Sequence, residues 1–277
     1  MYRIKYAAAN FIKYASLLLG TFAALVPIIV VFFASFKTNK EYGTSSPLTP
    51  PDNWLNLANY SKAFTNGKML LGFGNTVIIL VISIIGATLI GSMIAYVLNR
   101  FKFRGSKFLM GAFLLATLIP SVTTQVATFR IINSLHLVDT RFAPILLYLG
   151  TDIIAVYIFM QFLDSISESL DESAMLDGAS YFTIYWKIIL PLLAPAIVTV
   201  IIVKGVNIYN DFYTPFLYMP SEDLQVLSTA LFKFKGPYGS QWEVICAGIM
   251  ITIVPILIVF LALQKYIYNG FAQGSVK

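Results

Sequence analysis

The sequence is short of charge. Only 12% of its 277 residues are Asp, Glu, Lys or Arg, whereas 58% are hydrophobic; a soluble domain carries roughly 25% charged and 45–50% apolar residues. This composition excludes a water-soluble enzyme and also a disordered or collagen-like chain. The net charge of +6 is better explained by membrane orientation than by nucleic-acid binding. We therefore predict an integral membrane protein that lies in a lipid bilayer and binds no nucleic acid.

The side chains that metal and redox chemistry use are also scarce. The chain has one cysteine and one histidine, which excludes an internal disulfide and a cysteine-based metal site. The sequence also lacks G-x-x-x-x-G-K-[S/T], the loop whose backbone amides hold nucleotide phosphates. We expect no catalytic residue, no metal and no cofactor in this chain, so any ATP chemistry must lie on another polypeptide.

Long apolar runs are abundant. A membrane-spanning helix needs about 20 apolar residues, whereas the strands of a membrane barrel are about ten residues of alternating polarity, so the uninterrupted runs exclude a barrel. We predict an all-α membrane protein with one transmembrane domain over residues 1–277, and we expect Pro120 to kink the third span. The six predicted spans are residues 15–36, 70–98, 108–129, 142–163, 191–212 and 244–263.

Basic residues set the expected orientation, because Lys and Arg near span ends favour the cytoplasmic side. They precede the first span, and Arg100, Lys102, Arg104 and Lys107 crowd the short link between the second and third spans. We expect a multi-pass protein of the bacterial cell membrane with both termini in the cytoplasm. The link between the fourth and fifth spans, residues 164–190, is then cytoplasmic too.

The 164–190 loop begins with a predicted short helix over residues 164–175. Two S-x-x-E capping boxes start at Ser165 and Ser169 and would satisfy the first amides of such a helix. Gly178 is well suited to end it, because glycine adopts the positive φ that a helix C-terminus favours.

A second amphipathic segment, residues 181–189, follows in the same loop and leads to Pro191, where we expect the fifth span to begin. Proline suits a first helical position because its missing amide is not needed there. The predicted helix–turn–helix presents apolar side chains to the cytoplasm, which favours a docking site for a partner.

Residues of this loop resemble the E-A-A-x3-G-x9-I-x-L-P signature of ABC-importer permeases. They read Glu172-Ser173-Ala174, then Gly178, then Ile188-Ile189-Leu190-Pro191. Asp177-Gly178-Ala179 and the 270–277 tail are similar to the carbohydrate-uptake branch, specifically its maltose-type second permease, and the resemblance spans nearly the whole chain. The sequence departs from the family pattern at Ser173, where alanine is usual, and at Ser167, where proline is common.

The resemblance implies a type I ABC-importer permease fold and several partners. A homologous second permease would complete the translocation path as a heterodimer. A cytoplasmic ABC ATPase dimer would hold ATP and Mg, and an extracellular or periplasmic solute-binding protein would deliver a mono- or oligosaccharide, with a raffinose- or multiple-sugar-type substrate favoured. The residues that would couple the chain to the ATPase are Leu170, Glu172, Ser173, Ala174, Asp177, Gly178, Ala179 and Pro191.

Polar side chains inside the predicted spans are candidates for a solute path, because a charge at mid-bilayer costs roughly 2.5–3.5 kcal/mol on insertion scales. Lys204 lies about midway along the fifth span, and the i, i+3, i+7 spacing puts Asn207 and Asp211 on its face. Such groups, interleaved with aromatic rings, suit the hydroxyl groups and faces of sugars. The candidate path residues are Thr123, Thr124, Gln125, Lys204, Asn207, Asn210 and Asp211.

These path residues have simpler explanations as well. Threonines in spans often bond helices together, Asn210 and Asp211 could meet a binding protein at the outer interface, and Lys204 could pair with an acid on the second permease.

Two other functions stay open. An ABC permease for peptides or polyamines would keep the same loop but usually not this tail. An ion-coupled secondary transporter would use intramembrane carboxylates, but Asp152 and Asp211, the only acids near the spans, are expected toward the outer side.

Overall fold

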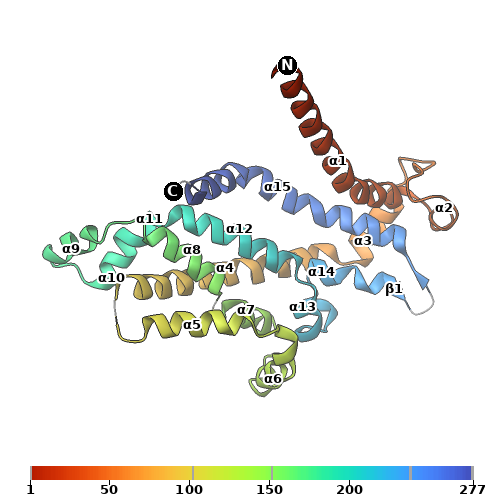
Figure 1. Cartoon of the computed structure of the whole chain (residues 1–277). Coiled ribbons are helices and arrows are strands. Elements are labelled where there is room, and N and C mark those ends of the chain that lie inside the picture. The colour runs from red at the N-terminus through yellow and green to blue at the C-terminus, as the bar shows by residue number, and fades with distance from the viewer. Residues whose placement is uncertain (1, 102, 151, 237–238, 276–277) are drawn as a thin grey trace. The chain divides into compact units, whose positions relative to one another are not determined.

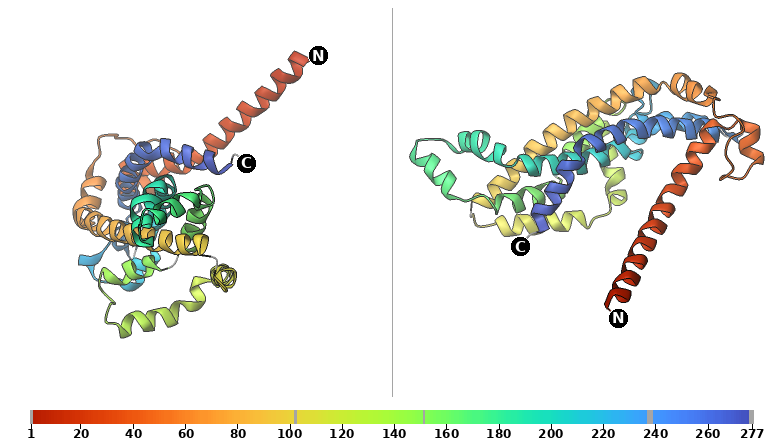
Figure 2. Two further views of the ribbon diagram at one scale, coloured as in Figure 1. Left: turned by 90° about the vertical axis from the view of Figure 1, so that its left-hand side faces the viewer. Right: turned by 90° about the horizontal axis from the view of Figure 1, so that it is seen from above.

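The computed structural model describes residues 2–101, 103–150, 152–236 and 239–275, and it is mainly helical. Lys102 and the last two residues of the tail lie outside the described residues. The chain divides into two compact units, whose elements can be followed by residue number in Figures 1 and 2. Met1–Leu70 with Ala230–Ile258 form the first unit, and Leu71–Thr229 with Val259–Lys277 form the second.

The first unit holds the N-terminal helices and the segment before the last long helix. In chain order it contains α1 (Tyr2–Phe36), α2 (Asn39–Thr44), α3 (Ala58–Asn66), the 3₁₀-helix η3 (Phe232–Phe234), β1 (Lys235–Gly236), β2 (Gly239–Ser240) and the first half of α15 (Trp242–Ser275). The two short strands pair antiparallel, with Lys235 opposite Ser240.

The end of α1 is held by side chains of α3. The Asn59 amide donates to the carbonyls of Ser35 at 2.9 Å and Lys37 at 2.8 Å, and the hydroxyls of Tyr60 and Ser35 are 2.7 Å apart. The last carbonyls of a helix have no partner within the helix, so Asn59 supplies the missing donors. Asn59 thereby fixes the direction in which the chain leaves α1.

The second unit holds most of the remaining helices. Its elements are α4 (Met69–Arg100, whose first two residues belong to the first unit), α5 (Ser106–Thr117), α6 (Ser121–Ser134), α7 (Phe142–Leu149), α8 (Ile153–Leu163), α9 (Ser169–Leu176), α10 (Tyr181–Ile184), the π-helix η1 (Tyr185–Ile189), α11 (Leu190–Leu192), α12 (Ala194–Asn210), α13 (Tyr213–Tyr218), the 3₁₀-helix η2 (Glu222–Leu224) and α14 (Leu227–Ala230, whose last residue belongs to the first unit).

The core of the second unit lies where α4, α8, η1 and α12 meet. Phe159 and Leu163 of α8 and Ile189 of η1 are completely buried there. A Cβ added to Gly91 of α4 would lie 3.5 Å from the Phe159 ring. This is an ordinary van der Waals distance, so α4 and α8 pack in direct contact at a small residue, as is common between membrane helices.

Three of the six predicted spans correspond to continuous helices, and the other three to bent helix pairs. Three helices are continuous, Asn10–Phe36, Met69–Arg100 and Trp242–Ala262, and three more spans exist if each bent helix pair crosses once. The α5–α6 pair bends by 101° around Pro120, as the sequence predicts, the α7–α8 pair by 43°, and the pair that joins Tyr181–Leu192 to α12 by 73°.

The helix does not begin at Pro191, where the sequence predicts the start of the fifth span. The helical segment runs through Pro191 to Leu192, and α12 begins at Ala194 with Pro195 in its first turn. Pro191 follows the π-helical turn η1 directly. Because a π-helical turn already interrupts the α-helical bonding pattern, the missing amide of Pro191 does not end the helix there.

Candidate functional site

The 164–190 loop leaves α8 by a turn rather than by a helix. The predicted helix over residues 164–175 is wrong in its first turn, because Asp164 caps α8 and α9 begins at Ser169. The two predicted capping boxes are absent: the Ser165 hydroxyl donates to the Phe162 carbonyl, and no side chain caps α9. Serine hydroxyls often bond locally in this way and so favour a turn over a helix.

The end of α9 is as predicted. Gly178 has φ +84°, its amide donates to the Met175 carbonyl at 3.0 Å, and the Ala179 amide donates to the Ala174 carbonyl at 2.9 Å. These two bonds form a Schellman motif, which requires the left-handed residue that glycine supplies most easily. Gly178 therefore fixes the bend between α9 and α10.

The loop presents an apolar and acidic surface at one end of the second unit, beyond the end of α4 (Figure 1). Leu176 is 89% exposed and Phe182 is 67% exposed. Ala174 and Ala179 pack inward against the core. The remaining predicted coupling residues all face outward: Leu170, Glu172, Ser173, Asp177, Gly178 and Pro191.

A buried ion pair joins this loop to α4. Arg100, the last residue of α4, donates through Nε to Asp171 Oδ2 at 2.8 Å, and both side chains are only 8% exposed. Arg100 Nη2 also donates to the Ile166 carbonyl at 2.8 Å. From the sequence, Arg100 is assigned to membrane orientation and Asp171 has no predicted role, so this contact was missed. Two residues 71 positions apart give no local signal of pairing.

A second ion pair links the fourth and fifth predicted spans. Lys204 Nζ of α12 lies 3.1 Å from Asp152 Oδ2, with the side chains 11% and 26% exposed. The other oxygen of Asp152 accepts the amides of Ile154 and Ala155 and caps α8. Asp152 therefore lies at the break between the two halves of its span, and Lys204 has a partner within its own chain. The sequence did carry a signal for this break, because Gly150 is a residue type that interrupts helices and Asp152 is one that favours a helix N-cap.

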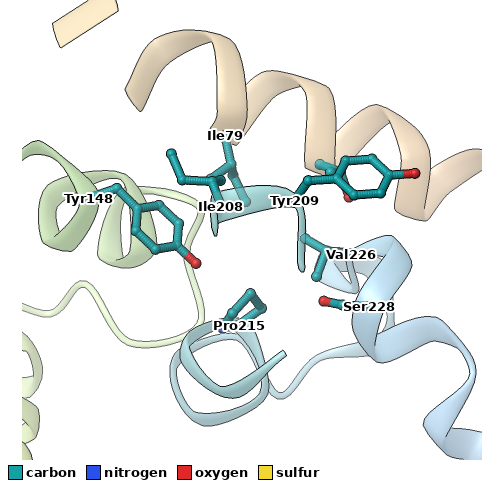
Figure 3. A pocket seen from close by; sticks show the side chains of 8 residues that line it. Ile79, Tyr148, Ile208, Tyr209, Pro215, Val226 and Ser228 are labelled. Atoms are coloured by element: carbon teal, nitrogen blue, oxygen red, sulfur yellow. The ribbon is translucent and has the colours of Figure 1, made fainter. Parts of the chain in front are cut away.

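Asp211 also bonds to the fourth span. The Tyr148 hydroxyl donates to Asp211 Oδ2 at 2.8 Å, and the Thr214 amide donates to Asp211 Oδ1 at 3.1 Å. A small cavity lies beside this contact, and the hydroxyls of Tyr148 and Ser228 point toward it (Figure 3). The space open to the centre of a water molecule is about 10 Å³, roughly what one buried water needs. In this conformation the cavity is too small for a sugar ring.

The other predicted path residues are not gathered into one site. Thr123 and Thr124 lie exposed on α6, and the half-buried Gln125 donates to the Tyr213 hydroxyl. Asn207 and Asn210 are exposed on α12. The structure thus brings Lys204 and Asp211 against the fourth span and leaves the amides Asn207 and Asn210 accessible.

Polar contacts also hold the segment that follows α12. The Asn75 amide of α4 donates to the carbonyls of Asp223 and Gln225 at 3.1 and 2.8 Å, while Asn75 Oδ1 accepts Arg141 Nε at 2.8 Å. Burial raises the pKa of Tyr218 in this segment, with Tyr213 adding to the rise, so its hydroxyl stays neutral. Asn75 is fully bonded and therefore positions this segment against α4.

The Lys204–Asp152 ion pair can be tested with two single variants and the double variant. Lys204→Met or Asp152→Asn alone leaves one buried charge without its partner, which costs about 3–5 kcal/mol, although asparagine still caps α8. We expect each single variant to lower the amount of protein in the membrane and its thermal stability in detergent. The double variant, which has neither charge, should recover most of both. Two neutral single variants, or a double variant as unstable as the worse single one, would contradict the pairing.

Known proteins resemble this chain over nearly its full length. It is 34% identical to a probable starch degradation products transport system permease protein of Thermoanaerobacterium thermosulfurigenes, covering 96% of this chain and 97% of the relative. It is 28% identical to the melibiose/raffinose/stachyose import permease protein of Bacillus subtilis, covering 92% of each. A chain in the crystal structure of a bacterial ABC transporter involved in the import of the acidic polysaccharide alginate has the same fold, with a TM-score of 0.79, 23% identity, and coverage of 93% of this chain and 96% of that chain.

The family match agrees with these likenesses. Residues 87–273 match the family described as binding-protein-dependent transport system inner membrane component, and this range includes the 164–190 loop and its signature. The resemblance to ABC-importer permeases is thereby confirmed, together with the all-helical permease fold. The chain belongs to the family of binding-protein-dependent transport system inner membrane components, and is a multi-pass transport permease rather than an enzyme.

Proposed function

We propose that this chain is one of two permease subunits of an ATP-driven sugar importer. In this proposal it forms half of the translocation path with a homologous second permease. A cytoplasmic ABC ATPase dimer carries ATP and Mg, and a solute-binding protein delivers the sugar from outside. The observation that carries the proposal is the 164–190 loop, which keeps the family signature and exposes most of it at one end of the second unit.

The loop is built to dock into a partner. Leu176 and Phe182 are large apolar side chains that are mostly exposed, and exposed apolar patches on a folded unit mark interaction sites. Glu172 is exposed beside them and would pair with a basic residue of the ATPase. Ala174 and Ala179 pack on the core, so they hold α9 in place rather than contact the partner. In this proposal the loop and both chain termini lie in the cytoplasm.

The substrate we propose is a neutral oligosaccharide of the raffinose or multiple-sugar type. Two relatives are described as permeases for starch degradation products and for melibiose, raffinose and stachyose, which supports a sugar. Lys204 supports a neutral one, because Asp152 already balances its charge. A carboxylated sugar would have to compete with Asp152 for Lys204, whereas hydroxyl groups can bond to the exposed Asn207 and Asn210.

The contacts of Asp152 and Asp211, the two carboxylates that could bind a coupling ion, argue against an ion-coupled transporter. Asp152 is paired with Lys204 and caps α8, and Asp211 is bonded to Tyr148 and Thr214. Carboxylates that bind a coupling ion must release and recapture it, whereas these two are engaged within the chain. A non-sugar ABC substrate stays an outcome of the test below.

The energy source and substrate can be tested together in cells that express the whole transporter. Uptake of labelled raffinose and maltotriose should persist when a protonophore collapses the proton gradient and should stop when ATP is depleted, because hydrolysis rather than ion flow drives the cycle. Loss of uptake with the gradient would indicate a secondary transporter. ATP-dependent uptake of a peptide or polyamine, with neither sugar transported, would show that the substrate is wrong.

The docking role of the loop predicts two damaging variants. Glu172→Lys should weaken ATPase binding by more than about tenfold, because removing one partner of a charged pair at an interface costs about 2–5 kcal/mol. Gly178→Leu forces a branched side chain into a left-handed conformation that costs roughly 1–2 kcal/mol and should misplace α9. Both variants should lose sugar uptake and ATPase co-purification while their level in the membrane stays normal.

Matched controls come from the same loop. Ser165→Lys adds a positive charge in the turn before α9, and Gly178→Asn keeps a residue that tolerates positive φ. Both controls should transport. Normal uptake by Glu172→Lys and Gly178→Leu would remove the coupling role from this loop.

A further inference from the structure

The end of α4 is tied to the 164–190 loop although the chain does not connect them directly. The loop is covalently continuous with α8 before it and, through α11, with α12 after it. It meets α4 through side chains 65 to 71 positions away, namely Asn99 with Asp164, Arg100 with the Ile166 carbonyl, and Arg100 with Asp171. A displacement of α9 reaches α8 and α12 along the chain, but it reaches α4 only across such contacts.

Arg100 fixes the geometry of this connection through three hydrogen bonds from one guanidinium group. Its Nε bonds to Asp171 Oδ2 at 2.8 Å, its Nη2 to the Ile166 carbonyl at 2.8 Å and its Nη1 to Asn99 Oδ1 at 3.0 Å. The same Asn99 donates to Asp164 Oδ1 at 2.7 Å. A planar guanidinium with donors in a fixed fork resists rotation and sliding in a way that a single ammonium does not. Both the turn before α9 and the first turn of α9 are therefore fixed to α4.

The buried carboxylate of Asp171 needs Arg100 as its partner. Its Oδ1 is buried and accepts no hydrogen bond within the residues that the structure describes, so Arg100 is the group that balances its charge. Asp171 also precedes Glu172, the residue proposed to meet the ATPase. A force on Glu172 therefore acts one residue away from the ion pair that leads to α4.

Other contacts between α4 and the loop lie in the second half of the loop. Phe101 contacts Tyr181 with ring centroids 4.9 Å apart, and Tyr96 contacts Tyr185 at 5.8 Å. The rings and a 2.8 Å hydrogen bond between the Ser92 and Tyr185 hydroxyls join α4 and the residue after it to α10 and η1. The first half of the loop, which contains α9, is joined to α4 by the polar contacts.

We propose that Arg100 and Asp171 are positioning residues that make the end of α4 move together with α9, so that motion of the ATPase reaches the second span through this ion pair. This inference rests on the proposed function, because it needs an ATPase that moves α9. It assigns Arg100 a mechanical role in addition to its contribution to membrane orientation.

The test measures one distance in two nucleotide states of the whole transporter. Spin labels are placed at Val97→Cys on α4 and Ser169→Cys on α9, both exposed positions, in a Cys246→Ala background that removes the one natural cysteine. Electron paramagnetic resonance then gives the distance without nucleotide and after trapping with ATP and vanadate. Arg104→Gln is the matched control, because it removes the same charge from the same short link at an exposed position.

We expect the wild type and Arg104→Gln to keep one distance in both states. Arg100→Gln and Asp171→Asn should still co-purify with the ATPase and hydrolyse ATP, but their distance should shift with nucleotide by an amount on the order of 1–5 Å, the range of helix displacements in switching proteins. Arg100→Lys should shift less than Arg100→Gln, because it keeps the charge and loses the fork. A distance that changes with nucleotide indicates that motion of α9 no longer reaches α4. A general loosening of the contact would change the distance equally in both nucleotide states.

Several results would overturn the inference. One is an unchanged distance in both states for Arg100→Gln and Asp171→Asn while they hydrolyse ATP, and another is a nucleotide-dependent shift in the wild type itself. If none of the three ion-pair variants assembles while Arg104→Gln does, Arg100 serves assembly rather than transmission. If no ATPase co-purifies with the wild type, the proposed function is wrong and this inference falls with it. If the ATPase co-purifies but either of the first two results is seen, only this inference is wrong.

Discussion

The low polarity of the bilayer and of the helix core is the constraint on which this structure depends. A buried charge is tolerated only when another group balances it, and the second unit satisfies this requirement twice within its own chain. Lys204 pairs with Asp152 between two spans, and Arg100 pairs with Asp171 where α4 meets the loop. The first pair fixes α8 against α12, and the second fixes α9 against α4, so paired charges set the positions of helices that apolar packing alone would leave free to slide.

Breaks in the spans follow from the same constraint. Where a membrane helix is interrupted, the freed backbone groups need partners inside the protein. At the break between α7 and α8, Asp152 supplies an acceptor for two amides while its other oxygen meets Lys204. One carboxylate thus satisfies a helix end and neutralises a cation. This double use explains why a charged residue is present at the middle of an apolar run.

Much of the fold could be predicted from the sequence because apolar runs and helix-ending residues are local signals. The runs give the spans, Pro120 gives the bend between α5 and α6, and Gly178 gives the end of α9. The pairing of charges could not be predicted, because Lys204 and Asp152 are 52 positions apart and either could have met a partner subunit. The start of the fifth helix was also missed, since the π-helical turn before Pro191 depends on packing against α4 and α8 rather than on propensity.

In the function proposed above, the 164–190 loop is the contact between this permease and an ATP-hydrolysing subunit. Leu176, which is 89% exposed at the end of α9, is the best position from which to probe it. The most direct measurement is site-specific cross-linking from Leu176→Cys in membranes that contain the whole transporter. We expect a covalent adduct with the ATPase subunit. An adduct with the solute-binding protein, or none with the ATPase in a transporter that hydrolyses ATP, would contradict it.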